Sequence, residues 1–230
     1  MLKLIEDLNS LANPDKARIL SRFFKTGKGD YGEGDIFLGV SVPATRSIAR
    51  RYLHLSFMEI DEMLVSRIHE HRLAALLVLV EKFRKSDELE KTKIYEFYLK
   101  NTGNVNNWDL VDLSADKIVG THLLDKNKDI LYKLAKSESV WERRIAIIAT
   151  FAFIKNGKFD DALKISELLL RDSHDLIQKA VGWMLREIGK RNQESEEGFL
   201  REHYRKMPRT MLRYAIERFD KKKKEVYMSR

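Results

Sequence analysis

The sequence predicts an all-α protein, a curved solenoid of antiparallel helix pairs with a concave basic face. Three observations predict this class: helix-breaking residues are rare, apolar residues recur at helical spacing, and similar helix starts recur about every 35 residues. The 230 residues contain only 3 prolines and 11 glycines, and five of these glycines fall between positions 27 and 39. The rest of the chain therefore offers few interruptions to helices.

The helix boundaries are predicted from local capping signals. Helix starts are expected at Asn13-Pro14, at Ser56 followed by Glu59, and at Ser139 followed by Glu142. In the last two pairs the serine can accept a hydrogen bond from the backbone of the third following residue, which satisfies a free N–H group. Helix stops are expected at Gly103, Gly157 and Gly189.

Two segments carry the helical pattern most clearly. Between positions 72 and 84 the apolar residues follow the i, i+3, i+4, i+7 rule, at Leu73, Leu76, Leu77 and Val80. The run from Ile145 to Ile154 is apolar on every face except for Thr150. A helix that is apolar all round is expected to be buried, so this run predicts the centre of the fold.

An internal repeat appears when basic residues near helix starts are aligned. The segments are Arg72-Leu-Ala-Ala-Leu, Arg144-Ile-Ala-Ile-Ile, Lys179-Ala-Val-Gly-Trp and Arg213-Tyr-Ala-Ile. Their starts lie 72, 35 and 34 residues apart, so one copy is missing near residue 108. This period is typical of HEAT-like solenoids, which predicts a single repeat domain over residues 1–230, although helices of similar length also produce chance periodicity.

Composition limits the function classes. The chain has 43 Lys and Arg against 35 Asp and Glu, a net charge of +8, which favours a polyanionic partner. It has no cysteine, which excludes disulfides, Cys-ligated metals and thiol nucleophiles. No apolar run is long enough to span a bilayer and no signal peptide is evident, so we expect a cytoplasmic globular protein with no membrane association.

Several catalytic motifs are absent or out of context. Gly27-x-Gly29-x-x-Gly32 matches a phosphate-binding loop, but that loop needs a preceding strand, and the segment Ala17–Lys25 before it is helical in pattern. We expect a loop over residues 26–35, in which Lys25, Lys28 and Tyr31 either touch DNA phosphates or form a solvated connector. His69-Glu-His71 places its rings on different helix faces, and no zinc or triad motif is present, so no metal site is expected.

The three tryptophans, Trp108, Trp141 and Trp183, all lie near the starts of repeats. Asp112 follows Trp108 by four residues and so shares its helix face. Arg143, Arg144 and Lys179 add cations near equivalent helix ends. This predicts a cleft with aromatic walls, one carboxylate and a basic rim, suited to a flat cationic ligand within a polyanion. The alternatives are that the tryptophans are core residues and that Asp112 forms a structural ion pair with Arg144.

Four blocks of the sequence resemble the AlkD-type DNA alkylation-repair glycosylases. They are KTGKGDYGEGDIFLGVSVPATR, NNWDLVD, WERRIAI and IQKAVGWMLREIGKR, and the resemblance covers nearly the whole chain. The cleft residues of the family fall on Trp108, Asp112, Arg144 and Trp183. A further aromatic residue of the family's cleft falls on Phe23 or Phe24.

The resemblance implies an enzyme that excises N3- or N7-alkylated purines from duplex DNA, without extruding the base into a pocket. Asp112, Trp108 and Trp183 are the implied catalytic residues. The expected phosphate contacts are Arg144, Arg143, Lys179, Arg213, Lys25 and Lys28. We expect a monomer that needs no metal or nucleotide cofactor and associates with the nucleoid when it binds DNA. The alternative is a non-catalytic helical-repeat scaffold that binds DNA or a protein through the same face.

Overall fold

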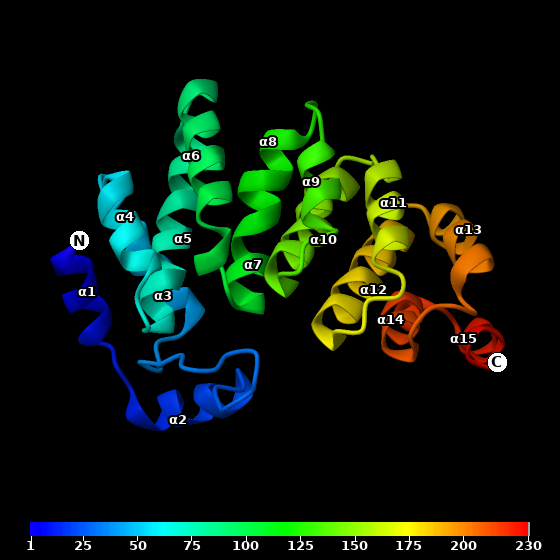
Figure 1. The fold of residues 1–230 in the computed structure, drawn as a ribbon, viewed down its shortest axis with the longest axis horizontal. Coiled ribbons are helices and arrows are strands. Elements are labelled where there is room, and N and C mark those ends of the chain that lie inside the picture. Colours follow the sequence, from blue (N-terminus) through cyan, green and yellow to red (C-terminus); the bar gives the residue numbers. More distant parts are fainter. Residues whose placement is uncertain (230) are drawn as a thin grey trace. The chain divides into compact units, whose positions relative to one another are not determined.

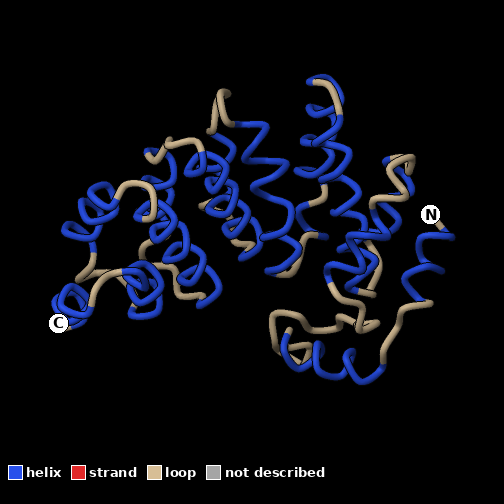
Figure 2. Tube along the Cα trace, turned by 180° about the vertical axis from the view of Figure 1, so that it is seen from behind, coloured by secondary structure: helices blue, strands red, loops and turns tan. Residues whose placement is uncertain are grey.

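The computed structural model describes residues 1–229, and these form helices joined by short loops (Figures 1 and 2). In chain order the helices are α1 (Leu2–Asn9), α2 (Pro14–Phe23), α3 (Val42–Ala49), α4 (Phe57–Leu64), α5 (His69–Lys85), α6 (Glu88–Lys100), η1 (Thr102–Asn104), α7 (Trp108–Ala115), η2 (Asp116–Gly120), α8 (Thr121–Leu123), α9 (Asp129–Leu134), α10 (Val140–Lys155), α11 (Asp160–Leu168), α12 (Asp175–Gly189), α13 (Gln193–His203), α14 (Arg209–Ala215), η3 (Ile216–Arg218) and α15 (Lys221–Met228). Over residues 1–229 the extended pairing amounts to one isolated bridge, between Ile36 and Ile68. The predicted all-α class is confirmed.

The chain divides into two compact units, Met1–Ser114 and a second unit that begins at Ala115. The first unit is organised around α5, which is buried along most of its length and packs against α1, α3, α4 and α6. The predicted helix starts are confirmed here: Asn13 accepts from the Lys16 N–H, and Ser56 and Glu59 form a reciprocal capping box. The single domain expected over residues 1–230 stays a prediction.

The second unit is organised around α10. Every residue of this helix from Arg144 to Ile154 is buried except for the half-buried Phe151. The helix packs against α9, α11, α12 and η2, and Ser139 caps its N-terminus by accepting from the Glu142 N–H. The prediction that the Ile145–Ile154 run is a buried central helix is confirmed for this unit.

The repeat predicted from the sequence corresponds to the second helix of successive helix pairs. Within the units α4 packs on α5, α9 on α10 and α11 on α12, and the Tyr98 hydroxyl of α6 hydrogen-bonds to Ser114 of α7 at 3.0 Å. The missing copy is α7, which begins at Trp108 as expected. The fifth residues of α7, α10, α12 and α14 are, in order, Asp112, Arg144, Lys179 and Arg213. Asp112 therefore occupies the position at which the three later helices carry a cation.

The glycine-rich segment has the expected irregular backbone, with one difference in detail. The helix before it, α2, ends at Phe23 rather than continuing to Lys25, because Lys25 adopts a left-handed conformation with φ of 52°. A helix rather than a strand thus precedes Gly27, so the phosphate-loop interpretation lacks the strand that it requires.

Two of the three predicted helix stops, Gly157 and Gly189, are confirmed, and the third needs correction. Gly157, with φ of 71°, follows the end of α10 as predicted. Gly103, by contrast, lies inside the turn η1, after α6 has ended at Lys100. Gly189 is the last residue of α12 itself, and a Cβ there would lie within covalent distance of the Glu196 carboxylate. Close approach of α13 therefore explains Gly189, and that contact is invisible in a local sequence pattern.

Across residues 1–229, no helix combines the length and the hydropathy needed to cross a membrane.

Candidate active site

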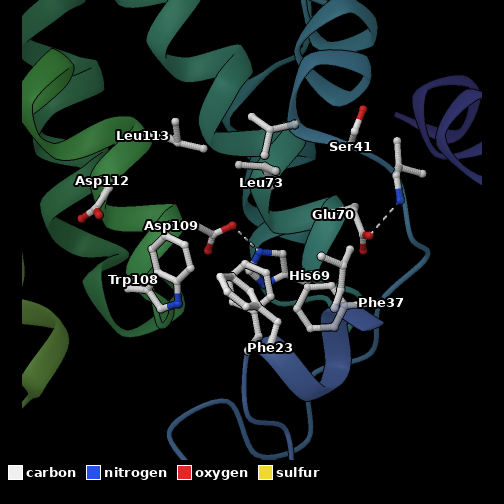
Figure 3. A pocket seen from close by; sticks show the side chains of 14 residues that line it. Phe23, Phe37, Ser41, His69, Glu70, Leu73, Trp108, Asp109, Asp112 and Leu113 are labelled. Carbon is white, nitrogen blue, oxygen red and sulfur yellow. Dashed lines mark hydrogen bonds and ion pairs between the residues drawn. The ribbon is translucent and has the colours of Figure 1, made fainter. Parts of the chain in front are cut away.

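A cavity of about 370 Å³ lies in the first unit between α2, α5, α7 and the segment that leads into α3 (Figure 3). Its walls are mainly apolar and aromatic, and they include Phe23, Phe24, Phe37, His69, Leu73, Trp108, Asp109 and Asp112. Four of the residues expected at the site, Trp108, Asp112, Phe23 and Phe24, thus line one cavity.

Trp108 and Asp112 lie on the same side of α7, one helical turn apart, and both are half-buried. Figure 3 shows them together at one side of the cavity. The i, i+4 spacing in the sequence therefore places an indole ring and a carboxylate beside each other, as predicted.

Both candidate N-terminal aromatic residues contact Trp108. The Phe24 ring stacks on the Trp108 ring with 5.1 Å between centroids and 16° between planes. The Phe23 ring meets Trp108 edge-on, with centroids 5.8 Å apart. Phe24 is 6% exposed and Phe23 is 61% exposed, so Phe24 belongs to the wall and Phe23 stands at the surface beside it.

A buried ionic cluster lies beneath these rings. The His69 ring is 2% exposed, its Nε2 donates to Asp109 at 2.8 Å, and its Nδ1 faces Asp35 at 3.4 Å. Arg72 donates to the other oxygen of Asp35 at 2.7 Å. Burial by itself would lower the pKa of His69, but the hydrogen bonds to Asp109 and Asp35 outweigh it and raise the pKa to about 9. The imidazole is therefore charged at neutral pH.

The pKa of Asp35 shifts in the opposite direction. Burial alone would raise the pKa of this carboxyl, but the hydrogen bonds from His69 and Arg72 and their positive charge hold it below its usual value. Two carboxylates and two cations therefore coexist as ions in the interior of the first unit. A buried ion keeps its charge only when it is paired in this way.

Arg144 and Arg143 lie at the start of α10 in the second unit. Arg144 is only 5% exposed and donates to the Leu176 carbonyl oxygen in the first turn of α12. Arg143 pairs with Asp172 at 2.7 Å and donates to the carbonyl oxygens of Ser137 and Glu138. Both guanidinium groups hold segments of the second unit together, and their contact with phosphate stays a prediction.

Trp183 lies on α12 among aromatic and charged side chains. Its ring is 5.8 Å from Phe151 of α10, and its Nε1 donates to Glu187 at 3.3 Å. The Lys155 ammonium lies 4.7 Å from the centre of the Phe151 ring, and the Arg191 guanidinium lies 5.8 Å from it on the α12 side. Trp183 is half-buried, so this cluster presents an aromatic face and cations at the surface of the second unit.

The other predicted phosphate contacts are exposed or partly exposed. Lys179 pairs with Asp175 at 2.7 Å, and Arg213 is exposed on α14. Lys25 and Lys28 are exposed in the glycine-rich segment, where Lys25 lies 6.0 Å from the Tyr31 ring. Their assignment to DNA phosphates also stays a prediction.

Sequence reasoning missed Asp35, Phe37, His69 and Asp109 in the first unit and Phe151 and Glu187 in the second. In the sequence, His69 stands out only as half of the His69-Glu-His71 pair, and Arg72 only as a basic residue near a helix start. The available signal was that α5 carries charged residues inside an otherwise apolar helix, since a buried charge requires a partner elsewhere in the chain.

Comparison with known proteins now identifies the class. The chain matches the family model of the DNA alkylation repair enzyme over residues 4–219, and it therefore belongs to this family. It is also similar to a solved structure described as a predicted DNA alkylation repair enzyme from Enterococcus faecalis. The two share 20% sequence identity over 91% of this chain and 97% of that chain, with a TM-score of 0.71, which shows a common fold. A search of curated proteins found no match.

Family membership supports a role in DNA alkylation repair and implies DNA as the substrate. Membership of the DNA alkylation repair family confirms the expected relationship to the AlkD-type proteins.

Proposed function

We propose that this protein is a DNA glycosylase that hydrolyses the N-glycosidic bond of N3- or N7-alkylated purines in duplex DNA, acting as a monomer without a cofactor. One observation carries the proposal: Trp108 and Asp112 stand one turn apart on α7 at the wall of an aromatic cavity. The chain's membership of a DNA alkylation repair family supplies the context.

The reaction suits a site that relies on a carboxylate and aromatic rings. Alkylation at N3 or N7 gives the purine a positive charge, so when the C1′–N bond breaks, the bonding electron pair leaves with a neutral base. Little or no general acid is then needed. Positive charge develops instead on the deoxyribose, where an anion stabilises it.

Asp112 is the residue proposed to supply that anion. Its carboxylate would stabilise the cationic sugar and orient a water molecule, whose oxygen forms the new bond to C1′ while its proton passes to Asp112 or to solvent. Trp108 and Trp183 would present π faces to the cationic nucleotide.

The cationic side chains are proposed to hold the DNA backbone. Arg144 would contact a phosphate, with further contacts from Arg143, Lys179, Arg213, Lys25 and Lys28. The lesion would be engaged from the backbone, and the base would not enter a pocket. This distinguishes the proposal from the common route in which glycosylases extrude the base.

The direct test is release of free 7-methylguanine from a duplex that carries this lesion, measured by chromatography under single-turnover conditions. An unmodified duplex of the same sequence is the control. We expect release from the damaged duplex only. If the wild-type protein binds DNA but releases no N-alkylpurine, the non-catalytic scaffold replaces the glycosylase.

A further inference from the structure

The ionic cluster beneath the cavity is attached to the helix that carries the proposed catalytic pair. Asp109, which accepts the hydrogen bond from His69 Nε2, directly follows Trp108 in the first turn of α7. Asn107 directly precedes Trp108, accepts from the Trp108 N–H at 2.8 Å and donates to Asp35 at 3.3 Å. The backbone on both sides of Trp108 is thus tied to the carboxylates that hold His69.

A second connection runs through the aromatic rings. Phe24 stacks on Trp108, and its ring also has neighbours at 5.1 Å (Phe23), 5.0 Å (Phe37) and 5.1 Å (His69). The Phe37 ring in turn stacks on His69 at 4.6 Å. The His69 imidazole is therefore linked to Trp108 through backbone anchors and through a stack of rings.

The charges that face His69 come from three elements. Asp35 lies in the segment after the glycine-rich loop, Arg72 lies on α5, and Asp109 lies on α7. With a protonated imidazole the cluster contains two anions and two cations, so its formal charge is zero. Loss of that proton leaves one ring nitrogen without a hydrogen to donate, so one buried carboxylate loses its hydrogen bond from His69.

We propose that His69 is a positioning residue for Trp108 and Asp112: by donating to Asp109 and facing Asp35, it holds the first turn of α7 in the orientation that presents these two side chains to DNA. This inference rests on the proposed glycosylase function. His69 itself makes no contact with the substrate, and its effect on the reaction passes through α7. Misplacement of a reacting group by about 1 Å costs roughly 10²-fold in rate, so the orientation of α7 has a measurable consequence.

The first test separates the rate of excision from DNA affinity. For His69→Gln we expect single-turnover release of 7-methylguanine to slow by about 10- to 100-fold, while the dissociation constant for the damaged duplex changes by less than about twofold. His71→Gln is the matched control. His71 lies two residues away on α5, is also buried, and contacts Ser66 instead of α7. The inference would be overturned if His69→Gln excised the base at the wild-type rate, or if His71→Gln lost as much of the excision rate as His69→Gln.

The second test asks whether the effect passes through Asp109. Asp109→Asn keeps the size of the side chain but removes the charge that His69 faces. If the two residues act through their contact, the double variant His69→Gln, Asp109→Asn should lose about as much activity as either single variant. Fully additive losses would contradict a shared route.

The third test does not depend on excision. In a Trp141→Phe, Trp183→Phe background, Trp108 is the only tryptophan, so its fluorescence reports on the first turn of α7. We expect the emission to change with a midpoint near pH 9, where His69 loses its proton, and the change to be absent after His69→Gln. Emission that does not change over this range would refute the positioning role. A wild type that releases no base would instead refute the glycosylase proposal, and this fluorescence test would still decide the role of His69.

Discussion

Trp108 and Trp183, the two tryptophans assigned to the reaction, have different surroundings. Trp108 stacks on a buried phenylalanine above a closed cluster of buried ions. Trp183 lies against the half-buried Phe151, and its indole donates to Glu187, which also pairs with Lys190 and Arg191. Buried pairs are little affected by salt, whereas exposed cations are screened by it. The first region is thus suited to hold a fixed geometry, and the second to attract a polyanion.

The largest effect should come from the carboxylate of the first region. Asp112→Asn keeps the shape but removes the charge that a cationic transition state requires, so excision of 7-methylguanine should slow by about 10²–10³-fold, equivalent to about 2.7–4 kcal/mol. DNA affinity should hold or rise slightly because one anion facing phosphates is lost.

Trp183→Leu is the matching change in the second region. It removes a π face whose interaction with a cation contributes about 1 kcal/mol, so excision should fall by only about 5- to 10-fold. Single-turnover rates at saturating protein measure both variants. Equal excision by Asp112→Asn and wild type would exclude the proposed role of Asp112.

The next largest effect concerns stability. Phe24→Ala removes a buried ring that four other rings contact, so the free energy of unfolding should fall by about 3 kcal/mol in urea denaturation. Phe151→Ala removes a half-buried ring and should cost about 1 kcal/mol. Phe23→Ala, at an exposed position, is the control and should change little. If Phe24→Ala and Phe151→Ala lowered the free energy of unfolding by similar amounts, the two regions would not differ in how much their aromatic packing stabilises the fold.

The salt dependence of the DNA-binding constant should differ between variants of the first and the second region. The logarithm of the binding constant should fall steeply with the logarithm of salt concentration, and Lys179→Ala or Arg213→Ala should each reduce the slope by about 1. His69→Gln should leave the slope unchanged because its charge is buried. Truncation before Lys221, at the start of α15, should weaken binding only modestly. A nearly flat salt plot for the wild-type protein would rule out phosphate-dominated binding.

The smallest expected effects are opposite changes in stability with pH. The pKa of His69 is raised from 6.5 to about 9, so its contribution is complete below pH 6.5 and is lost as the pH rises through 9. Burial would raise the pKa of Glu187, but hydrogen bonds from Lys190 and Arg191 hold it below 4.5. Its contribution is therefore present above pH 4.5 and is lost as the pH falls through its folded value.

Thermal unfolding between pH 3 and pH 10 tests both predicted directions of the pH dependence of stability. The difference in melting temperature between wild type and His69→Gln should shrink at alkaline pH, and the difference for Glu187→Gln should shrink at acid pH. The same trend in both variants would contradict the distinction between the two regions.

Features decided by neighbouring residues were predictable from the sequence. The caps at Asn13, Ser56 and Ser139 depend on groups three residues apart, and the buried α10 follows from its uninterrupted apolar run. The adjacency of Trp108 and Asp112 follows from the geometry of one helical turn. Local signals of this kind require no knowledge of how the helices pack.

Features decided by distant contacts were not predictable in this way. His69 and Asp109 are 40 residues apart in the sequence, and Phe24, which directly follows α2, contacts rings of α5 and α7. Arg72 shows the consequence most clearly. As a basic residue near a helix start it resembles Lys179, yet it is buried against Asp35, whereas Lys179 is partly exposed.

The shared fifth position of α7, α10, α12 and α14 has a consequence for how such a site can evolve. In a repeat protein each unit packs mainly on its neighbours, so one copy can change the residue at a given position without repacking the others. Asp112 stands where the later copies carry Arg144, Lys179 and Arg213. In the proposed function, reversal of charge in a single copy would turn one of a series of cationic positions into a centre for chemistry, while the cations of the other copies are proposed to hold the DNA backbone.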